Sequence, residues 1–186
     1  MKINKYFISL FLCLFALQIA VPVYMIIHRE NVLRYGKQYK FRTAPVDPYD
    51  AFRGKYVALK MQEDTAPVLD NSQFLHGQKL YALIEEDRDG FSKITGVLKN
   101  RPLRGDYIKA RYGYNDGSKI YLNLPFDRFY MDEKDAPLAE SAYRTYSRSD
   151  KQDAYILVRI KDGSAVIEDL FINNKPILQF LKDSEE

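Results

Sequence analysis

Few of the side chains on which catalytic and metal sites commonly depend are present in this sequence. Its 186 residues include one cysteine, two histidines and no tryptophan. The single cysteine, Cys13, excludes an internal disulfide and a thiolate metal cluster. A Ser-His-Asp triad or a histidine zinc site would depend on His76 alone. We therefore assign no catalytic residue, no metal ligand and no cofactor from the sequence.

An excess of charge of one sign is also lacking. The 28 basic and 25 acidic side chains leave a net charge of +3, and no dense block of lysine and arginine occurs. Nucleic-acid-binding domains usually carry a basic patch or stripe, so we expect no nucleic-acid partner. The P-loop, the nucleophile elbow of serine hydrolases and the zinc-protease motif HExxH are missing as well.

One long hydrophobic run is present, and it lies at the N-terminus. Tyr6 to Ile27 spans 22 residues without a charged side chain, and Lys2 and Lys5 precede it. A helix needs about 20 apolar residues to cross a bilayer, whereas the core of a secretory signal has about 7–15. We predict an uncleaved transmembrane signal anchor over residues 1–29, with a cleaved signal as the alternative.

Basic residues gather after this anchor, at Arg29, Arg34, Lys37, Lys40 and Arg42. The cluster predicts a juxtamembrane linker over residues 30–44, which is either solvated or held against lipid headgroups. Because basic residues stand on both sides of the anchor, the charge rule for membrane topology leaves its orientation open.

Strand patterns separated by turn signals fill the rest of the chain. Segments 79–99, 106–124 and 154–172 each read as two strands joined by a turn that contains Asp-Gly. Segment 135–147 reads as a short amphipathic helix. We predict a β-domain over residues 45–180 and an acidic tail over 181–186. The predicted fold class is mainly β, with an N-terminal transmembrane helix and an antiparallel β-sandwich or barrel-like domain that holds one short helix.

The β-domain contains an internal resemblance. Arg53-Gly54-x-Tyr56 recurs as Arg104-Gly105-x-Tyr107, and residues 81–102 align with 155–176. These matches predict a pseudo-duplicated domain with halves at about 45–102 and 103–176, and the alternative is that β-hairpins resemble one another by chance. We expect Gly54 and Gly105 to occupy turns that a side chain would strain.

Two polar and aromatic segments supply the candidate binding residues. The first is segment 45–59, which contains the first copy of the repeat and is compared with the second copy at 104–107. The second is the acidic stretch 124–140. The nine candidates are Asp47, Asp50, Arg53, Tyr56, Arg104, Asp106, Tyr107, Arg128 and Glu133. The alternative for the first segment is a structural corner, and for the second a solvated edge that caps the helix. The acidic stretch also lacks the spacing of known calcium loops.

The repeated segment carries a family resemblance. "GKYVALKM" keeps Gly54, Tyr56 and Leu59 of the motif, and "GDYIKARY" keeps Gly105, Asp106, Tyr107 and Tyr112. On these residues the sequence resembles the bacterial membrane-associated family named for its GDYXXLXY motif. The resemblance implies a membrane-anchored protein whose domain lies outside the cytoplasm and works beside multi-spanning membrane partners. It implies no catalytic residues.

These observations favour a binding protein over an enzyme. We expect a single-pass protein of the bacterial inner membrane, with an extracytoplasmic C-terminal β-domain that serves as a binding or accessory subunit of an envelope membrane complex. One alternative is a hydrolase that uses carboxylates such as Asp47, Asp50 or Glu133. A second alternative is a lipid- or glycan-binding module, which requires a cavity between the sheets.

Overall fold

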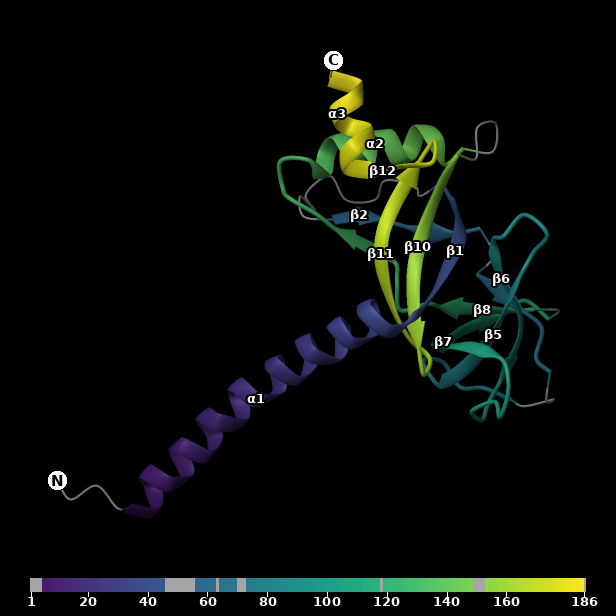
Figure 1. The fold of residues 1–186 in the computed structure, drawn as a ribbon. Helices are drawn as coiled ribbons and strands as arrows, with labels where there is room; N and C mark the ends of the chain where they lie inside the picture. Colours follow the sequence, from purple (N-terminus) through teal and green to yellow (C-terminus); the bar gives the residue numbers. More distant parts are fainter. Residues whose placement is uncertain are drawn as a thin grey trace.

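The computed structural model of the protein describes residues 5–45, 56–62, 64–69, 73–117, 119–148 and 153–185. A long N-terminal helix leads into a mainly β domain built from two antiparallel sheets that approach a closed barrel (Figure 1). The predicted fold class is confirmed. The domain carries two helices where the sequence predicted one.

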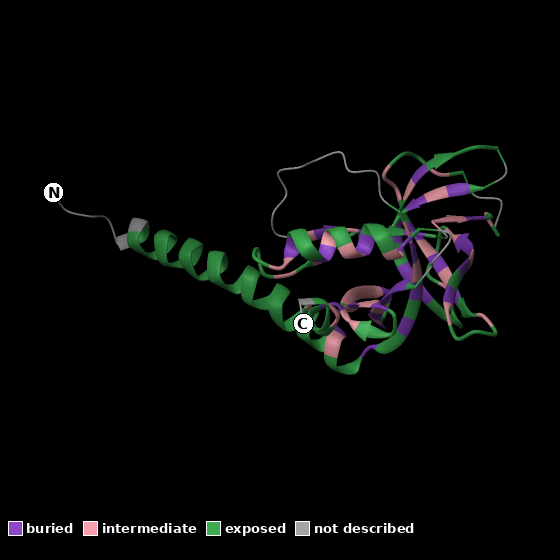
Figure 2. Ribbon diagram, turned by 90° about the horizontal axis from the view of Figure 1, so that it is seen from above, coloured by how far each residue is buried: buried purple, intermediate pink, exposed green. Residues whose placement is uncertain are grey.

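The N-terminal helix, α1 (Lys5–Tyr35), is 31 residues long and includes Pro22. Its apolar length is long enough to cross a bilayer, and none of the side chains in this stretch is buried against the domain. Figure 2 shows the described residues of α1 exposed along nearly the whole helix. A helix of this composition is typical of a membrane anchor or of a signal sequence.

The first sheet has the strand order β12-β11-β10-β1-β3. Its neighbouring strands pair antiparallel throughout. Its members in chain order are β1 (Lys37–Ala44), β3 (Lys60–Met61), β10 (Ala154–Lys161), β11 (Ser164–Ile172) and β12 (Lys175–Pro176).

The second sheet has the strand order β4-β8-β7-β5-β6. Its members are β4 (Thr65–Ala66), β5 (Lys79–Glu86), β6 (Ser92–Leu98), β7 (Asp106–Asn115) and β8 (Ile120–Asn123). The remaining strands, β2 (Tyr56–Ala58) and β9 (Arg128–Tyr130), form a separate two-stranded sheet.

The main core joins both sheets to the C-terminal helices. Side chains such as Phe41, Ile108 and Ile156 point into this core. Along β1 the buried residues alternate with more exposed ones, because successive residues of a strand face opposite sides. Helices α2 (Ala136–Tyr146) and α3 (Ile177–Glu185) lie together at one end of the domain (Figure 1). Tyr143 of α2 and Ile177 of α3 enter this core.

Residues 30–44 do not form the predicted linker. Helix α1 continues to Tyr35, and β1 begins at Lys37 and pairs with β10 in the middle of the first sheet. The linker was predicted from the basic residues alone. Tyr39, Phe41 and Thr43 are, however, buried, and they alternate along β1 with Lys40 and Arg42. This period of two is the strand signal, and Lys40 and Arg42 lie on the other face of that strand. The predicted acidic tail also differs, because α3 extends to Glu185.

The two aligned hairpins resemble each other down to one irregularity. The β5–β6 pairing shifts register between Leu83 and Ile84, and the β10–β11 pairing shifts between Leu157 and Val158, which the sequence alignment places together. The Arg-Gly-x-Tyr strands differ, however, because β2 pairs with β9 while β7 lies between β5 and β8. Strands of the predicted second half therefore complete the sheet of the first, and duplication of the whole halves stays a prediction.

One of the two predicted turn glycines can be placed. Gly105 has a φ of +86°, which an L side chain rarely adopts, so the expectation of a special backbone shape is met there. Gly54 lies outside the described residues.

Candidate functional site

The end of α1 packs on the β10–β11 hairpin. Val32 of the helix is buried, and the Gly36 N–H donates to its carbonyl oxygen at 2.8 Å. The Arg159 guanidinium donates to the Gly36 carbonyl at 3.3 Å, and the His28 ring lies 3.2 Å from the Ser164 hydroxyl. The helix is thus joined to the first sheet by packing and by hydrogen bonds over two turns. We call this region, residues 28–37 with 159–164, the junction.

Gly36 allows the chain to turn from helix to strand without separating them. A Cβ atom at this position would lie 2.4 Å from the Val32 carbonyl oxygen and 3.0 Å from the Ile160 backbone nitrogen. Both neighbours are backbone atoms, so a side chain could not be accommodated by a rotamer change. Glycine at this position therefore permits the close approach of α1 to β10.

Asp106 of the second motif copy lies beside the junction rather than in a cleft. Its carboxylate accepts a hydrogen bond from the Lys37 ammonium at 2.9 Å, which ties the start of β7 to the start of β1. The Tyr39 hydroxyl and the Lys37 ammonium both hold the pKa of Asp106 below its ordinary value. Burial, and then the Asp106 carboxylate, raise the pKa of Tyr39 to about 12. This arrangement stabilises an ionised carboxylate in a structural ion pair.

Tyr107 has a similar structural position. Its ring is buried, packs edge-on against Tyr81 and lies under the Arg101 guanidinium at 5.6 Å. A Cβ at Gly163 would lie 2.4 Å from this ring, so the tip of the β10–β11 hairpin rests on Tyr107. The motif residues Asp106 and Tyr107 thus hold β7 against the same hairpin that receives α1.

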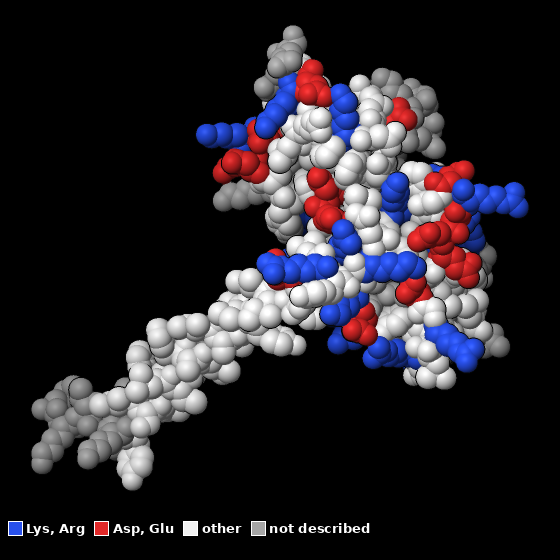
Figure 3. Space-filling model, viewed as in Figure 1, with Lys and Arg blue, Asp and Glu red and all other residues white. Residues whose placement is uncertain are grey.

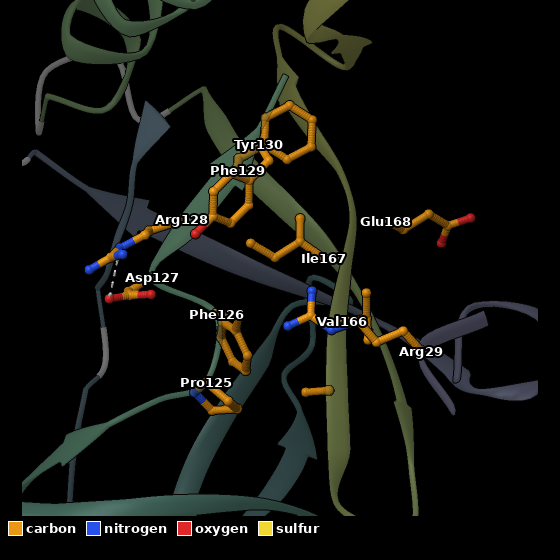
Figure 4. A pocket seen from close by; sticks show the side chains of 11 residues that line it. Arg29, Pro125, Phe126, Asp127, Arg128, Phe129, Tyr130, Val166, Ile167 and Glu168 are labelled. Carbon is orange, nitrogen blue, oxygen red and sulfur yellow. Dashed lines mark ion pairs between the residues drawn. The ribbon is translucent and has the colours of Figure 1, made fainter. Parts of the chain in front are cut away.

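A cleft of about 470 Å³ lies between α1, β9 and β11. Figure 4 shows the Arg29 side chain reaching into it from α1, with Phe126 and Phe129 on one side and Ile167 of β11 on the other. Arg29 makes no ion pair with any residue that the structure describes. The cleft therefore combines one uncompensated guanidinium with apolar and aromatic walls.

The remaining charged groups at the cleft are already paired. Arg128 lies 3.7 Å from the Asp127 carboxylate, and its guanidinium covers the Tyr56 ring at 5.1 Å. The hydrogen bond to Tyr130, and then the charge of Asp127, raise the pKa of Arg128. Glu168 points away from the cleft (Figure 4) and accepts a hydrogen bond from the Arg159 guanidinium at 2.7 Å.

The predicted binding residues fall at separate places. Tyr56 and Arg128 come together at the cleft because β2 pairs with β9, whereas Asp106 and Tyr107 lie at the junction. Arg104 is exposed in the loop before β7, and Glu133 is exposed before α2.

Three candidates of the first motif copy, Asp47, Asp50 and Arg53, lie outside the described residues. In the described part of the chain, no group of three or more His, Cys, Asp or Glu side chains could hold a metal ion. Two of the described carboxylates, Asp87 and Asp89, do meet, but they meet at the guanidinium of Arg42.

The sequence reasoning did not select Arg29, Phe129 or Tyr130 as site residues. Arg29 was assigned only to the basic cluster after the anchor, and the aromatic pair was part of an acidic segment. For Phe129 and Tyr130, the available signal was the close mixture of aromatic and charged side chains in "FDRFY". Their meeting depends on the tertiary approach of β9 and β11 to α1, which one sequence does not contain.

One protein-family model matches a part of the chain that contains most of these elements. Residues 18–170 match the family model described as GDYXXLXY protein. The chain belongs to the GDYXXLXY family. The match runs from the middle of α1 into β11, so it includes the junction and the cleft of this GDYXXLXY protein. The resemblance predicted from the motif residues is thereby confirmed. No curated protein and no solved structure matches the chain.

Proposed function

We propose that this GDYXXLXY protein is a membrane-anchored binding subunit of an envelope membrane complex. In this proposal α1 spans the bacterial inner membrane once, and the β-domain lies outside the cytoplasm. The observation that carries the proposal is the junction, because it fixes a β-domain directly onto a helix whose apolar length is fully exposed. An anchor joined so closely holds the cleft at a constant height above the bilayer.

The cleft is the surface that we assign to the partner. Arg29 is only two positions beyond Ile27, the last residue of the uncharged run, and the helical rise of about 1.5 Å per residue places it near the membrane surface. A multi-spanning membrane protein can present an acidic side chain at that height, next to its apolar helices. Arg29 would pair with the acidic group, and Phe129 and Tyr130 would pack against the neighbouring apolar residues.

Hydrolysis has less support than binding. Of the three candidate carboxylates named for it, only Glu133 lies within the described residues, and it is exposed beside α2. Asp127 does line the cleft, but Arg128 neutralises it. A general acid or base needs a partner group that shifts its pKa and a site that excludes water. Both carboxylates are exposed to solvent, so neither lies in a site that excludes water.

Photo-crosslinking in intact membranes tests the assignment of the cleft. A photoreactive amino acid at Tyr130, which is 63% exposed in the cleft, should give an adduct with a multi-spanning membrane protein. The same amino acid at Leu178, 49% exposed in α3 and not among the residues that line the cleft, is the matched control and should give none. Arg29→Glu should weaken the Tyr130 adduct by charge repulsion. Equal adducts at both positions, or none at Tyr130, would contradict the proposal.

A further inference from the structure

The loop between β6 and β7 exposes an apolar side chain among cations. Leu103 is completely exposed, with a relative accessibility of 101%, and the exposed Arg101 and Arg104 flank it. A single exposed leucine is ordinary on a protein surface, so exposure alone decides nothing. Leucine between long basic side chains is, however, the composition of segments that enter the interface of a bilayer with their cations at the phosphates.

The position of this loop distinguishes it from other exposed sites. Arg101 pairs with Asp162 at 3.2 Å, which attaches the loop to the tip of the β10–β11 hairpin. The Lys109 N–H of β7 donates to the Gly163 carbonyl at 2.9 Å and holds the same tip. The next residue along the hairpin, Ser164, contacts His28 of α1.

His28 directly follows the uncharged run that ends at Ile27. The chain of contacts from His28 through the hairpin tip to Arg101 therefore places the loop near the level at which α1 leaves an apolar layer. Figure 3 agrees with this placement, since Lys and Arg side chains gather where α1 meets the domain, while the described length of α1 below carries almost no charge.

We propose that residues 99–105 form a second membrane contact, in which Leu103 enters the headgroup layer and Arg101 and Arg104 bind phosphates of anionic phospholipids. The inference rests on the proposed anchoring of α1 in a bilayer. Once α1 is inserted, the loop meets the lipid at a high effective concentration, so one leucine and two guanidinium groups are sufficient for contact. The contact would restrict rotation of the domain about α1 and would hold the cleft at one orientation.

The absence of tryptophan makes this contact directly measurable. Leu103→Trp introduces the only tryptophan of the chain, and the full-length protein can be placed in nanodiscs that contain brominated anionic phospholipid. We expect bromine to quench this tryptophan. The matched control is Leu75→Trp, because Leu75 is 78% exposed but lies elsewhere on the domain. Leu75 precedes β5, whose first residue, Lys79, lies opposite Arg111 in the β5–β7 strand pairing, whereas Asp106 begins β7 at its other end. Leu75→Trp should be quenched little, and equal quenching at both positions would overturn the proposal.

Two further experiments distinguish failure of the loop contact from failure of the anchoring of α1. Leu14→Trp, in the middle of the apolar run, should be quenched in every disc if α1 spans the bilayer. Quenching at position 14 without quenching at 103 would overturn the loop contact alone, whereas no quenching at position 14 would overturn the anchoring and the loop contact together. Arg104→Gln, or discs in which the brominated lipid is zwitterionic, should reduce quenching at 103. Unchanged quenching in both would overturn the role of anionic phosphates.

Discussion

Replacing Tyr143 with alanine should lower the free energy of unfolding by about 3–5 kcal/mol, the usual cost of deleting a large buried ring. Tyr143 is among the most completely buried large side chains, and it joins α2 to the main core. Its hydroxyl donates to the Ala44 carbonyl at 2.7 Å and accepts from the Lys60 N–H at 3.4 Å. One residue thus closes the space between α2, the end of β1 and β3.

Chemical denaturation of the full-length protein in nanodiscs, followed by circular dichroism, measures this effect. Tyr143→Phe keeps the ring but leaves the Ala44 carbonyl and the Lys60 N–H without their side-chain partner, so we expect a loss of about 1–2 kcal/mol. Leu138→Ala is the matched control, because Leu138 is an exposed residue of the same helix, and its effect should stay below about 0.5 kcal/mol. Similar losses at positions 143 and 138 would show that α2 is not held by its buried face.

Replacing Gly36 with valine should detach α1 from the domain without unfolding the sheets. The new side chain would collide with the Val32 carbonyl and the Ile160 backbone nitrogen, whereas the pairing of β1 with β10 begins only at Lys37. Overpacking of this kind costs about 1–3 kcal/mol, which corresponds to about a 5- to 150-fold loss of the docked state. The measurement is the yield of a short crosslink between two cysteines, introduced as His28→Cys and Ser164→Cys. Cys13→Ser removes the natural cysteine.

The crosslink should form efficiently in the parent protein, because the two side chains lie 3.2 Å apart, and should fall sharply with Gly36→Val. Arg34→Ala is the control, since Arg34 pairs only with Glu30 of its own helix among the described residues, and it should leave the yield unchanged. An undiminished crosslink in the valine variant would show that Gly36 does not control the docking of α1.

The architecture could be predicted from local patterns because its elements are regular in sequence. The uncharged run predicted α1. The turn glycines marked the boundary between the two strands of each hairpin, as at Gly90 and Gly163, which both have positive φ. The segment 135–147 gave α2, since its apolar residues recur at helical spacing. These signals depend on residues close together in the chain.

The candidate site was harder to predict because it depends on long-range pairing. Lys37 and Asp106 form their ion pair across 69 positions of sequence, and Arg29 meets Phe126 only where α1, β9 and β11 converge. The basic residues after the anchor were interpreted as a linker, since the strand period of β1 coincides with a charge cluster. Turn residues identify the strands that pair within a hairpin, but one sequence does not show which strands far apart in the chain become neighbours. The junction and the cleft therefore could not be predicted from it.

Paired C-terminal fusions to alkaline phosphatase and to green fluorescent protein test most directly the claim that this is a single-pass membrane protein with an external β-domain. We expect an active phosphatase fusion that sediments with the membranes at its full, uncleaved size, and a fluorescent fusion that does not fluoresce. A silent phosphatase with a bright fluorescent fusion would contradict the orientation. An active phosphatase released in soluble form would contradict the anchor.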